Sequence, residues 1–541
     1  MAFWVWIFVY ILSIYRSILY TMKKCLLIII SIYLLSACTV QTEDDLKIKE
    51  RDPQLDISIG FWDIGNSISD EKDDYLLFLE NKFNINIIPR NVTWANINQK
   101  LLYWGASSNL PDIFAGDILL SDVYYQWIEE GKIRALPEEL SRFPNISRIT
   151  EQQSLDKLKI KGKLYFFPRN SAPDSSYNSA ERGILSRKDW REHLGFDKPQ
   201  TFDEYLELAK AFVEMDPDGN GVDDTVGITF TNRNYLSAVF LSTVPEAASK
   251  TWKYEDGRWI PGYSSKDMMK GFNELSILWN EGVLDYNINT LTGYQGFERF
   301  CIGRTGMIFT QAKPRKIRDL SVTWKKYNDS DLTDLIEVLP IWLNSEGKRF
   351  AFHEGKNFWS SSYFSSNVSD IKMEKILSLY DFLLSPEGQM SLKYGIPDVD
   401  FSIKGNKVER KDDRDISIKY PSIDVFRDLA IWSLNFTNWT KDEFSLNISP
   451  ENIMDMCMEQ YLQSKAILNP VNMDIQYMKT PLKSRFERGD SIFDTFYKVM
   501  IADDPETEWN RQMDQLKSEG LDQAIEEVNR KALEMGINPP S

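Results

Sequence analysis

Histidine is scarce in this chain, which has 541 residues but only two histidines, His193 and His353. This excludes His-rich zinc sites and leaves little opportunity for a serine or cysteine nucleophile with a histidine base. Neither histidine has a nucleophile or acid partner at a known motif spacing. Cysteine is also rare and forms neither a CxxC pair nor a disulfide framework, with residues only at Cys25, Cys38, Cys301 and Cys457. Any bound metal must therefore use oxygen ligands.

Positive charge is in deficit as well. The chain has 63 Lys and Arg against 80 Asp and Glu, which gives a net charge of −17 and a pI near 4.9. A protein with this charge has no general field that attracts nucleic acids, so we expect no nucleic-acid partner. With 43% hydrophobic residues, the chain is apolar enough to build two or three folded cores.

Long hydrophobic runs are missing except at the N-terminus. From Met22 the chain has two lysines, then an apolar run over Leu26–Leu35, and then the small residues Ser36-Ala37-Cys38. The run is too short to span a bilayer and is typical of an export signal. Residues 1–21 precede this second, complete signal, so we expect translation to begin at Met22.

The end of this segment, Leu35-Ser36-Ala37-Cys38, resembles the bacterial lipobox, in which the cysteine becomes the lipidated first residue of the mature chain. We therefore expect residues 1–37 to be a signal region, Cys38 to carry lipid, and residues 38–54 to form a polar tether. This would anchor the protein at the extracytoplasmic face of the cell membrane. A signal with an accidental cysteine, or an uncleaved anchor, remains the alternative.

The next part of the chain alternates strands and helices. β-Branched runs predict strands at 55–62, 85–89 and 110–117, and apolar residues at helical spacing predict helices over 75–83 and 94–104. This βαβαβ order favours a parallel sheet whose loops gather at the carboxyl ends of the strands. Trp62, Asp63 and Asp117 fall on such loops.

A second α/β region follows residue 168. Strands are predicted at 183–186 and 306–309, and helices over 268–282 and in the tail from 490 to 536. The clearest helix begins at Thr201, which forms a capping box with Glu204, and ends before Pro217.

The loop after this helix carries oxygen side chains at relative positions 1, 3, 5 and 9, with a glycine at position 6. Hard oxygen ligands on a flexible loop suit calcium better than magnesium. With the carbonyl of position 7, the candidate ligands are Asp216, Asp218, Asn220, Val222 and Asp224. Position 12 is Gly227 instead of a bidentate glutamate, so we expect affinity of the weak extracellular type. A solvated Asp/Asn/Gly turn is the alternative.

Several short motifs occur in a defined order. They are Ser108–Ile113, Gly131–Leu140, Gly162–Pro168, Arg187–Trp190, Pro199–Glu204, Glu281–Asp285, Gly303–Met307 and Ser385–Gln389. With the lipobox and the acidic loop, they resemble the extracellular solute-binding lipoproteins of ABC importers, in the oligosaccharide-binding group related to LipO and the alginate-binding proteins. In the alginate-binding branch the loop continues to a glutamate where this chain has Thr225.

The resemblance implies an α/β, two-lobed periplasmic-binding-protein-like fold with a hinge and an interlobe cleft. Lobe 1 would take residues 55–168 and 306–355, and lobe 2 residues 169–305 and 356–541. It also implies structural Ca²⁺ in the acidic loop and ABC permease subunits as partners. An oligosaccharide would be captured by lobe closure without covalent chemistry, so the protein would not be an enzyme.

Sugar recognition uses flat apolar faces for pyranose rings and planar polar groups for hydroxyls. Residues just after predicted strands or at lobe crossings are the candidates for ligand binding: Trp62, Asp63, Asp117, Asn170, Asn232, Gln311 and Trp359. Core packing for the tryptophans and surface solvation for the polar residues are the alternatives.

Two other functions stay open at this point. A lipoprotein of this kind could present its ligand to a membrane sensor instead of a permease. An exported polysaccharide-cleaving enzyme needs only two suitably spaced carboxylates, and 80 acidic residues leave room for such a pair.

Overall fold

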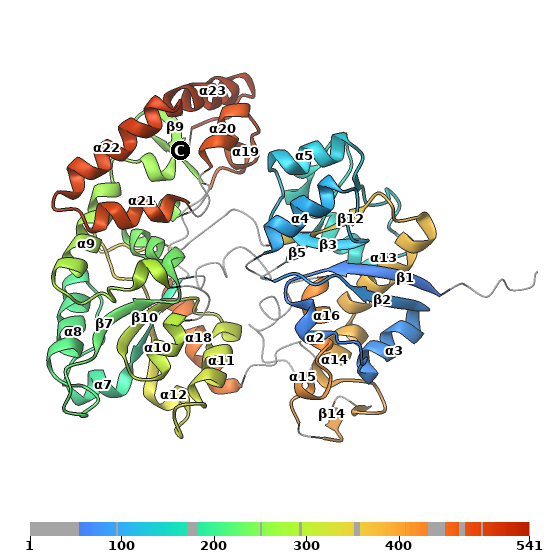
Figure 1. Ribbon diagram of the computed structural model, residues 1–541, viewed down its shortest axis with the longest axis horizontal. Coiled ribbons are helices and arrows are strands. Elements are labelled where there is room, and N and C mark those ends of the chain that lie inside the picture. The colour runs from blue at the N-terminus through green and yellow to red at the C-terminus, as the bar shows by residue number, and fades with distance from the viewer. Residues whose placement is uncertain are drawn as a thin grey trace, which may run out of the picture. The chain divides into compact units, whose positions relative to one another are not determined.

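A computed structural model (Figure 1) describes residues 54–93, 96–170, 182–248, 251–291, 295–350, 358–405, 407–412, 414–430, 450–464, 471–487 and 491–539. The chain divides into two compact units, Met1–Leu55 and Asp56–Ser541, and the second is described below. The expected start at Met22, the signal region 1–37, Cys38 and nearly all of the tether 38–54 lie outside the described residues.

The first sheet is built from two distant parts of the chain. Its strand order is β2-β1-β3-β12-β4, and β5 also pairs with β12. The parallel pair β1 and β3 confirms the expected βαβ arrangement, whereas β12 runs antiparallel to its partners. The strands are β1 (Leu55–Gly60), β2 (Ile85–Pro89), β3 (Ile113–Gly116), β4 (Ile133–Arg134), β5 (Phe167–Asn170) and β12 (Phe358–Ser365).

The helices that pack with this sheet share one hydrophobic core with it. They are α2 (Ile64–Ser67), α3 (Asp74–Phe83), α4 (Ile97–Ala106), α5 (Asp122–Glu129), α6 (Pro144–Thr150), η1 (Gln153–Leu158), α13 (Asp370–Leu384), α14 (Pro386–Tyr394), α15 (Ile416–Lys419) and α16 (Ile423–Leu429). A hairpin of β13 (Phe401–Lys404) and β14 (Lys407–Arg410) follows α14. Asp112 accepts hydrogen bonds from the Ser58 amide at 2.8 Å and from Lys372 at 3.1 Å, and thereby links β1 to α13.

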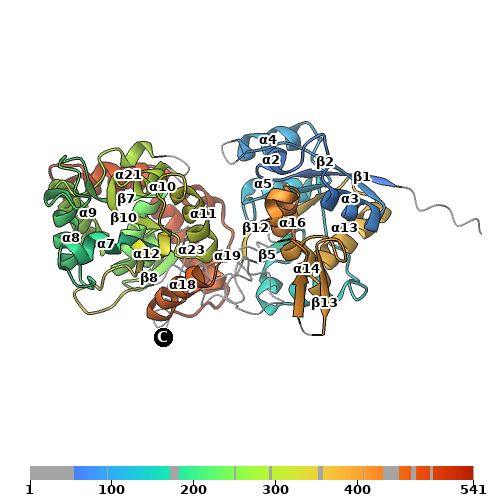
Figure 2. The same cartoon turned by 90° about the horizontal axis from the view of Figure 1, so that it is seen from below.

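The second sheet has the order β11-β6-β10-β7. Its strands are β6 (Gly183–Arg187), β7 (Val226–Phe230), β10 (Thr305–Thr310) and β11 (Ile336–Leu339). Side chains alternate between its faces: Met307 and Phe309 contribute to one buried cluster and Ile308 to another. Helix α8 (Phe202–Glu214) lies on one side of β7 and β10, and α10 (Gln295–Cys301) lies on the other (Figure 2).

The remaining elements pack around this second sheet. They are α7 (Lys188–His193), η3 (Arg233–Ser242), η4 (Pro245–Ala248), β8 (Trp252–Glu255), β9 (Arg258–Pro261), η5 (Gly262–Ser264), α9 (Met268–Asn280), η6 (Ile288–Thr290), α11 (Pro314–Trp324), α12 (Leu332–Leu335), α18 (Glu451–Ser464), α19 (Met473–Tyr477), α20 (Pro481–Phe486), α21 (Ser491–Met500), α22 (Pro505–Ser518) and α23 (Leu521–Glu534). The predicted capping box between Thr201 and Glu204 is present at the start of α8.

The structure corrects the expected division of the chain at two places. Strands β10 and β11, expected in lobe 1, belong to the second sheet, because β10 pairs with β6 and β7, and β11 pairs with β6. Strand β12, expected in lobe 2, belongs to the first sheet, because it pairs with β3, β4 and β5. The apolar pattern of a buried strand predicts its existence but not its partner, since pairing is decided by contacts between distant segments.

In the part of the chain that the structure describes, no helix combines the length and apolar character required to cross a bilayer.

Candidate functional site

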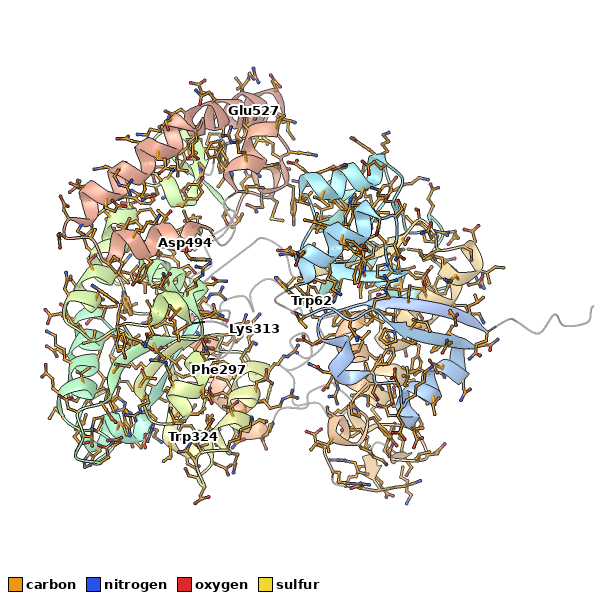
Figure 3. The ribbon with its side chains drawn as sticks, viewed as in Figure 1. Trp62, Phe297, Lys313, Trp324, Asp494 and Glu527 are labelled. Atoms are coloured by element: carbon orange, nitrogen blue, oxygen red, sulfur yellow. The ribbon has the colours of Figure 1, made fainter. Side chains whose placement is uncertain are left out.

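Two of the tryptophans predicted to bind ligand, Trp62 and Trp359, meet at the edge of the first sheet where β1 and β3 have their carboxyl ends. Trp62 follows the end of β1 (Figure 3), and Trp359 belongs to β12. Their ring centroids lie 5.4 Å apart with an interplanar angle of 34°. Trp62 is buried, with 7% exposure, and its ring also meets that of Phe61 edge-on. Trp359 is only partly buried, so it offers the more accessible ring.

Left-handed backbone follows each of these tryptophans. Asp63 has φ of 53° and Ser360 has φ of 54°, a region that residues other than glycine adopt at a cost in free energy. In β12 the register against β5 shifts between Phe358 and Ser361, so Trp359 and Ser360 form an irregularity of the β-bulge type. Such bulges re-aim side chains and are common beside functional sites.

Arg169 packs against Trp62 of this pair. It is fully buried and donates hydrogen bonds from Nη1 to Ser360 Oγ at 2.7 Å and from Nε to the carbonyl of Asp428 at 2.8 Å. Its guanidinium lies over the rings of Phe61, at 4.7 Å, and Trp62, at 5.1 Å. Burial lowers the pKa of Arg169 to about 9 because desolvation disfavours the charged form.

The sequence prediction missed Arg169. An arginine after a buried strand run is usually exposed at the surface, so its residue type did not suggest a buried role. Its position directly before the candidate Asn170 is the only signal that could have drawn attention to it.

Two further predicted residues lie at the same edge. Asn170 pairs across the ladder with Phe358, is 2% exposed, and its Oδ1 is buried without a hydrogen-bond partner among the described residues. Asp117 is exposed and directly follows Gly116, which pairs with Ser361. The structure therefore brings five of the predicted residues to one edge of the first sheet: Trp62, Asp63, Asp117, Asn170 and Trp359.

The other two predicted residues, Asn232 and Gln311, belong to the second sheet. Because Phe230 pairs in parallel with Phe309, both follow their strands at the same level and share that sheet's carboxyl edge. Asn232 Oδ1 accepts a hydrogen bond from the Asn234 amide at 3.1 Å, so this oxygen already caps η3.

An ion pair joins the segment after β10 to the Arg169 cluster. Arg315, in the first turn of α11, places Nη1 2.9 Å from Oδ2 of Asp428. Asp428 therefore holds one arginine through its backbone carbonyl and another through its carboxylate, which is almost fully buried. Its second carboxylate oxygen, Oδ1, is buried without a partner among the described residues.

The acidic loop adopts a tight turn stabilised by its own side chains. Asp216 has φ of 44° and accepts from the amides of Asn220, at 3.1 Å, and Gly221, at 2.9 Å. Asp218 Oδ2 accepts from the Asn220 side chain at 2.8 Å, and Asn220 Oδ1 accepts from the Val222 amide at 2.6 Å. Backbone amides thus orient the candidate ligand oxygens of Asp216 and Asn220.

Asp224 is held separately from the other predicted ligands. Its Oδ2 forms an ion pair with Arg304, which precedes β10, while its Oδ1 is buried and has no hydrogen-bond partner within the ranges that the structure describes. Across the described ranges, no group of three His, Cys, Asp or Glu side chains is placed to hold a metal ion. The donor set, all oxygen with one orphaned carboxylate atom, has the chemistry that suits a hard cation, but Asp224 is shared with a guanidinium.

The two described cysteines show no nucleophilic character. Cys301 and Cys457 are free and buried in the same cluster. Burial raises the pKa of Cys301 to about 12 and also raises that of Cys457, so both stay protonated and inert at neutral pH.

Comparisons with known proteins agree with this fold. No family model matches the chain. The chain is 23% identical over 452 residues to the polygalacturonan/rhamnogalacturonan-binding protein YtcQ of Bacillus subtilis, covering 82% of this chain and 84% of YtcQ. It is 24% identical over 331 residues to lipoprotein LipO of the same organism, covering 59% of this chain and 62% of LipO.

Solved structures match over most of the chain. The substrate-binding protein FusA of Streptococcus pneumoniae with kestose gives a TM-score of 0.67 at 16% identity, covering 89% of this chain and 99% of FusA. The alginate-binding protein AlgQ2 without calcium gives a TM-score of 0.66 at 18% identity, and the match covers 88% of this chain and 98% of AlgQ2. YtcQ, FusA and AlgQ2 are all named as binding proteins. The chain therefore has the expected α/β fold of the solute-binding proteins of ABC importers, and the resemblance seen in its motifs is confirmed.

Proposed function

We propose that this protein is the substrate-binding component of an ABC importer and captures oligosaccharides reversibly. The observation that carries the proposal is the Trp62–Trp359 pair at the sheet edge, which presents a partly exposed indole ring. Across the ladder from the neighbouring Phe358 lies Asn170, whose buried Oδ1 finds no hydrogen-bond partner in the described part of the chain. Aromatic faces bind the apolar side of sugar rings, and polar groups such as this amide accept hydroxyl protons.

The names of the relatives suggest the ligand class. YtcQ is named for polygalacturonan and rhamnogalacturonan, and FusA for fructooligosaccharides. We accordingly propose an oligosaccharide ligand, with galacturonan fragments and fructooligosaccharides as the first candidates. Ligand that contacts both sheets would favour a closed state, and the permease would recognise the shift in population.

The location and the metal belong to the same proposal. Cys38 of the lipobox would carry the lipid anchor, which would keep the protein at the extracytoplasmic face of the cell membrane within reach of permease subunits. The loop residues Asp216, Asp218, Asn220 and Asp224, with the carbonyl of Val222, would hold a structural Ca²⁺. Bound calcium would neutralise the charge of the carboxylates and brace the connection between α8 and β7.

Calorimetry with a saccharide panel tests the proposal. Mature protein from residue 39 onward is titrated with galacturonan oligosaccharides, kestose and alginate oligosaccharides, and each mixture is then analysed for cleavage products. We expect stoichiometric binding of at least one saccharide, with the saccharide recovered intact. Lack of binding across the panel, or shortened products after many turnovers, would contradict the proposal.

A further inference from the structure

Ser360 has a backbone conformation that its strand does not require. It lies in the middle region of the eight-residue strand β12, is 2% exposed, and has φ of 54°. A serine in left-handed backbone costs free energy, and the surrounding structure must maintain it. Regular β backbone at this position would remove the register shift against β5 and turn the neighbouring Trp359 ring to another direction.

The side chain of Ser360 provides that support through Arg169. Its hydroxyl accepts a hydrogen bond from Arg169 Nη1 at 2.7 Å, a charge-assisted contact between two buried side chains. Arg169 is itself fixed by the carbonyl of Asp428 at 2.8 Å. The bulge is therefore tied to α16, which packs in the same core.

The same guanidinium also supports the neighbouring ring. Arg169 lies 5.1 Å from the centroid of the Trp62 ring, and Trp62 in turn contacts Trp359. One buried cation thus contacts both the backbone bulge that aims Trp359 and the ring against which Trp359 rests. Displacement of Arg169 would loosen both.

We propose that Arg169 and Ser360 are positioning residues that fix the Trp359 ring as the surface on which a sugar ring stacks, with Trp62 as its support. This inference rests on the proposed function for the identity of the ligand, but the ring geometry can be tested without any ligand. Trp62 is then mainly a packing residue, and Trp359 is the ring that contacts the sugar.

Ser360→Ala and Ser360→Gly separate the hydroxyl from the backbone conformation. Alanine removes the acceptor and keeps the cost of left-handed backbone, whereas glycine removes the acceptor and adopts this backbone freely. Ser362→Ala is the matched control: Ser362 is buried two residues along the same strand and donates to the carbonyl of Leu429 at 3.0 Å.

Two measurements are made on each variant. The first is the exciton signal that two indoles in contact give in the circular dichroism spectrum of the ligand-free protein, identified by its loss in Trp359→Phe. The second is calorimetric affinity for galacturonan oligosaccharides and kestose. Unfolding curves check that each variant remains folded.

We expect both Ser360 variants to lose most of the exciton signal and to bind saccharide about tenfold more weakly, the effect of one charge-assisted hydrogen bond. Ser362→Ala should retain both properties. An unchanged signal in Ser360→Gly would overturn the role of the hydroxyl and of Arg169. If the wild-type protein binds neither saccharide, the proposed ligand class fails, while the exciton signal still decides the positioning role.

Discussion

The carboxylate of Glu274 accepts a hydrogen bond from the indole Nε1 of Trp342 at 3.0 Å and one from Ser242 Oγ at 3.2 Å, both at Oε2. Trp342 is fully buried, and its ring packs against Phe309 of the second sheet. Burial raises the pKa of Glu274 to about 7, although the two hydrogen bonds act in the opposite direction.

This pKa predicts a component of stability that depends on pH. Because the folded protein holds the proton of Glu274 more tightly than the unfolded chain does, this group's contribution to stability decreases as pH rises from about 4.5 to above 7. We expect a loss of about 3 kcal/mol over that interval. Glu274→Gln should remove it, which urea unfolding at pH 5, 6, 7 and 8 would measure.

Glu281→Gln provides the control for this measurement. Glu274 belongs to α9, and Glu281 is exposed directly after that helix and pairs with Lys210. Its unfolding free energy should vary with pH as that of the wild type does. A Glu274→Gln profile parallel to the wild-type profile would show that Glu274 is ionised in both states.

Replacement of the two tryptophans should separate binding from stability. Trp359→Ala should weaken saccharide binding more than tenfold and cost little stability, since the ring is partly exposed. Trp62→Ala should destabilise the first core by about 3 kcal/mol, since the ring is buried. Calorimetry and urea unfolding measure the two effects, and wild-type affinity in Trp359→Ala would remove this ring from the site.

Calcium should stabilise the loop between α8 and β7. We expect a chelator to lower the melting temperature of the wild-type protein, with calcium at about 10⁻⁴ to 10⁻³ M restoring it. Asp216→Asn should melt at the chelated temperature under both conditions. Asp256→Asn, an exposed position in the β8–β9 turn that pairs with Lys266, should respond as the wild type does; a chelator without effect on any of the three would contradict the calcium site.

The buried ion pair between Arg191 of α7 and Glu337 of β11 predicts a double-mutant effect. Arg191 Nε lies 2.6 Å from Glu337 Oε1, and both side chains are almost fully buried. Arg191→Met alone should cost about 3 kcal/mol, because the buried carboxylate of Glu337 then keeps only Lys198, 3.5 Å from its Oε2, as an ion-pair partner. The double variant with Glu337→Met should recover most of that loss, and equal losses in both variants would argue against a charge effect.

The sequence predicted features that depend on neighbouring residues. The strand at Ile85–Pro89 and the capped start of α8 were both correct to the residue, since periodicity and capping act within one turn or one strand. Trp62 and Asp117 also lie just after their strands as expected.

Features that depend on contacts between distant segments could not be predicted from the sequence pattern. The partners of β10 and β12 are decided by tertiary pairing, so both segments were assigned to the wrong sheet. Neither the bulge at Ser360 nor the buried guanidinium of Arg169 has a local signal, because serine rarely adopts positive φ and arginine is rarely buried.

The late position of β12 in the chain affects how the protein can fold during synthesis. Within the described residues, β4 and β5 join the first sheet through β12, which begins only at Phe358. A nascent chain that ends before this residue lacks the strand that connects the sheet, so its N-terminal part cannot complete a native core. Such dependence on long-range pairing slows folding, so the N-terminal strands would have to wait for β12 before the first core closes.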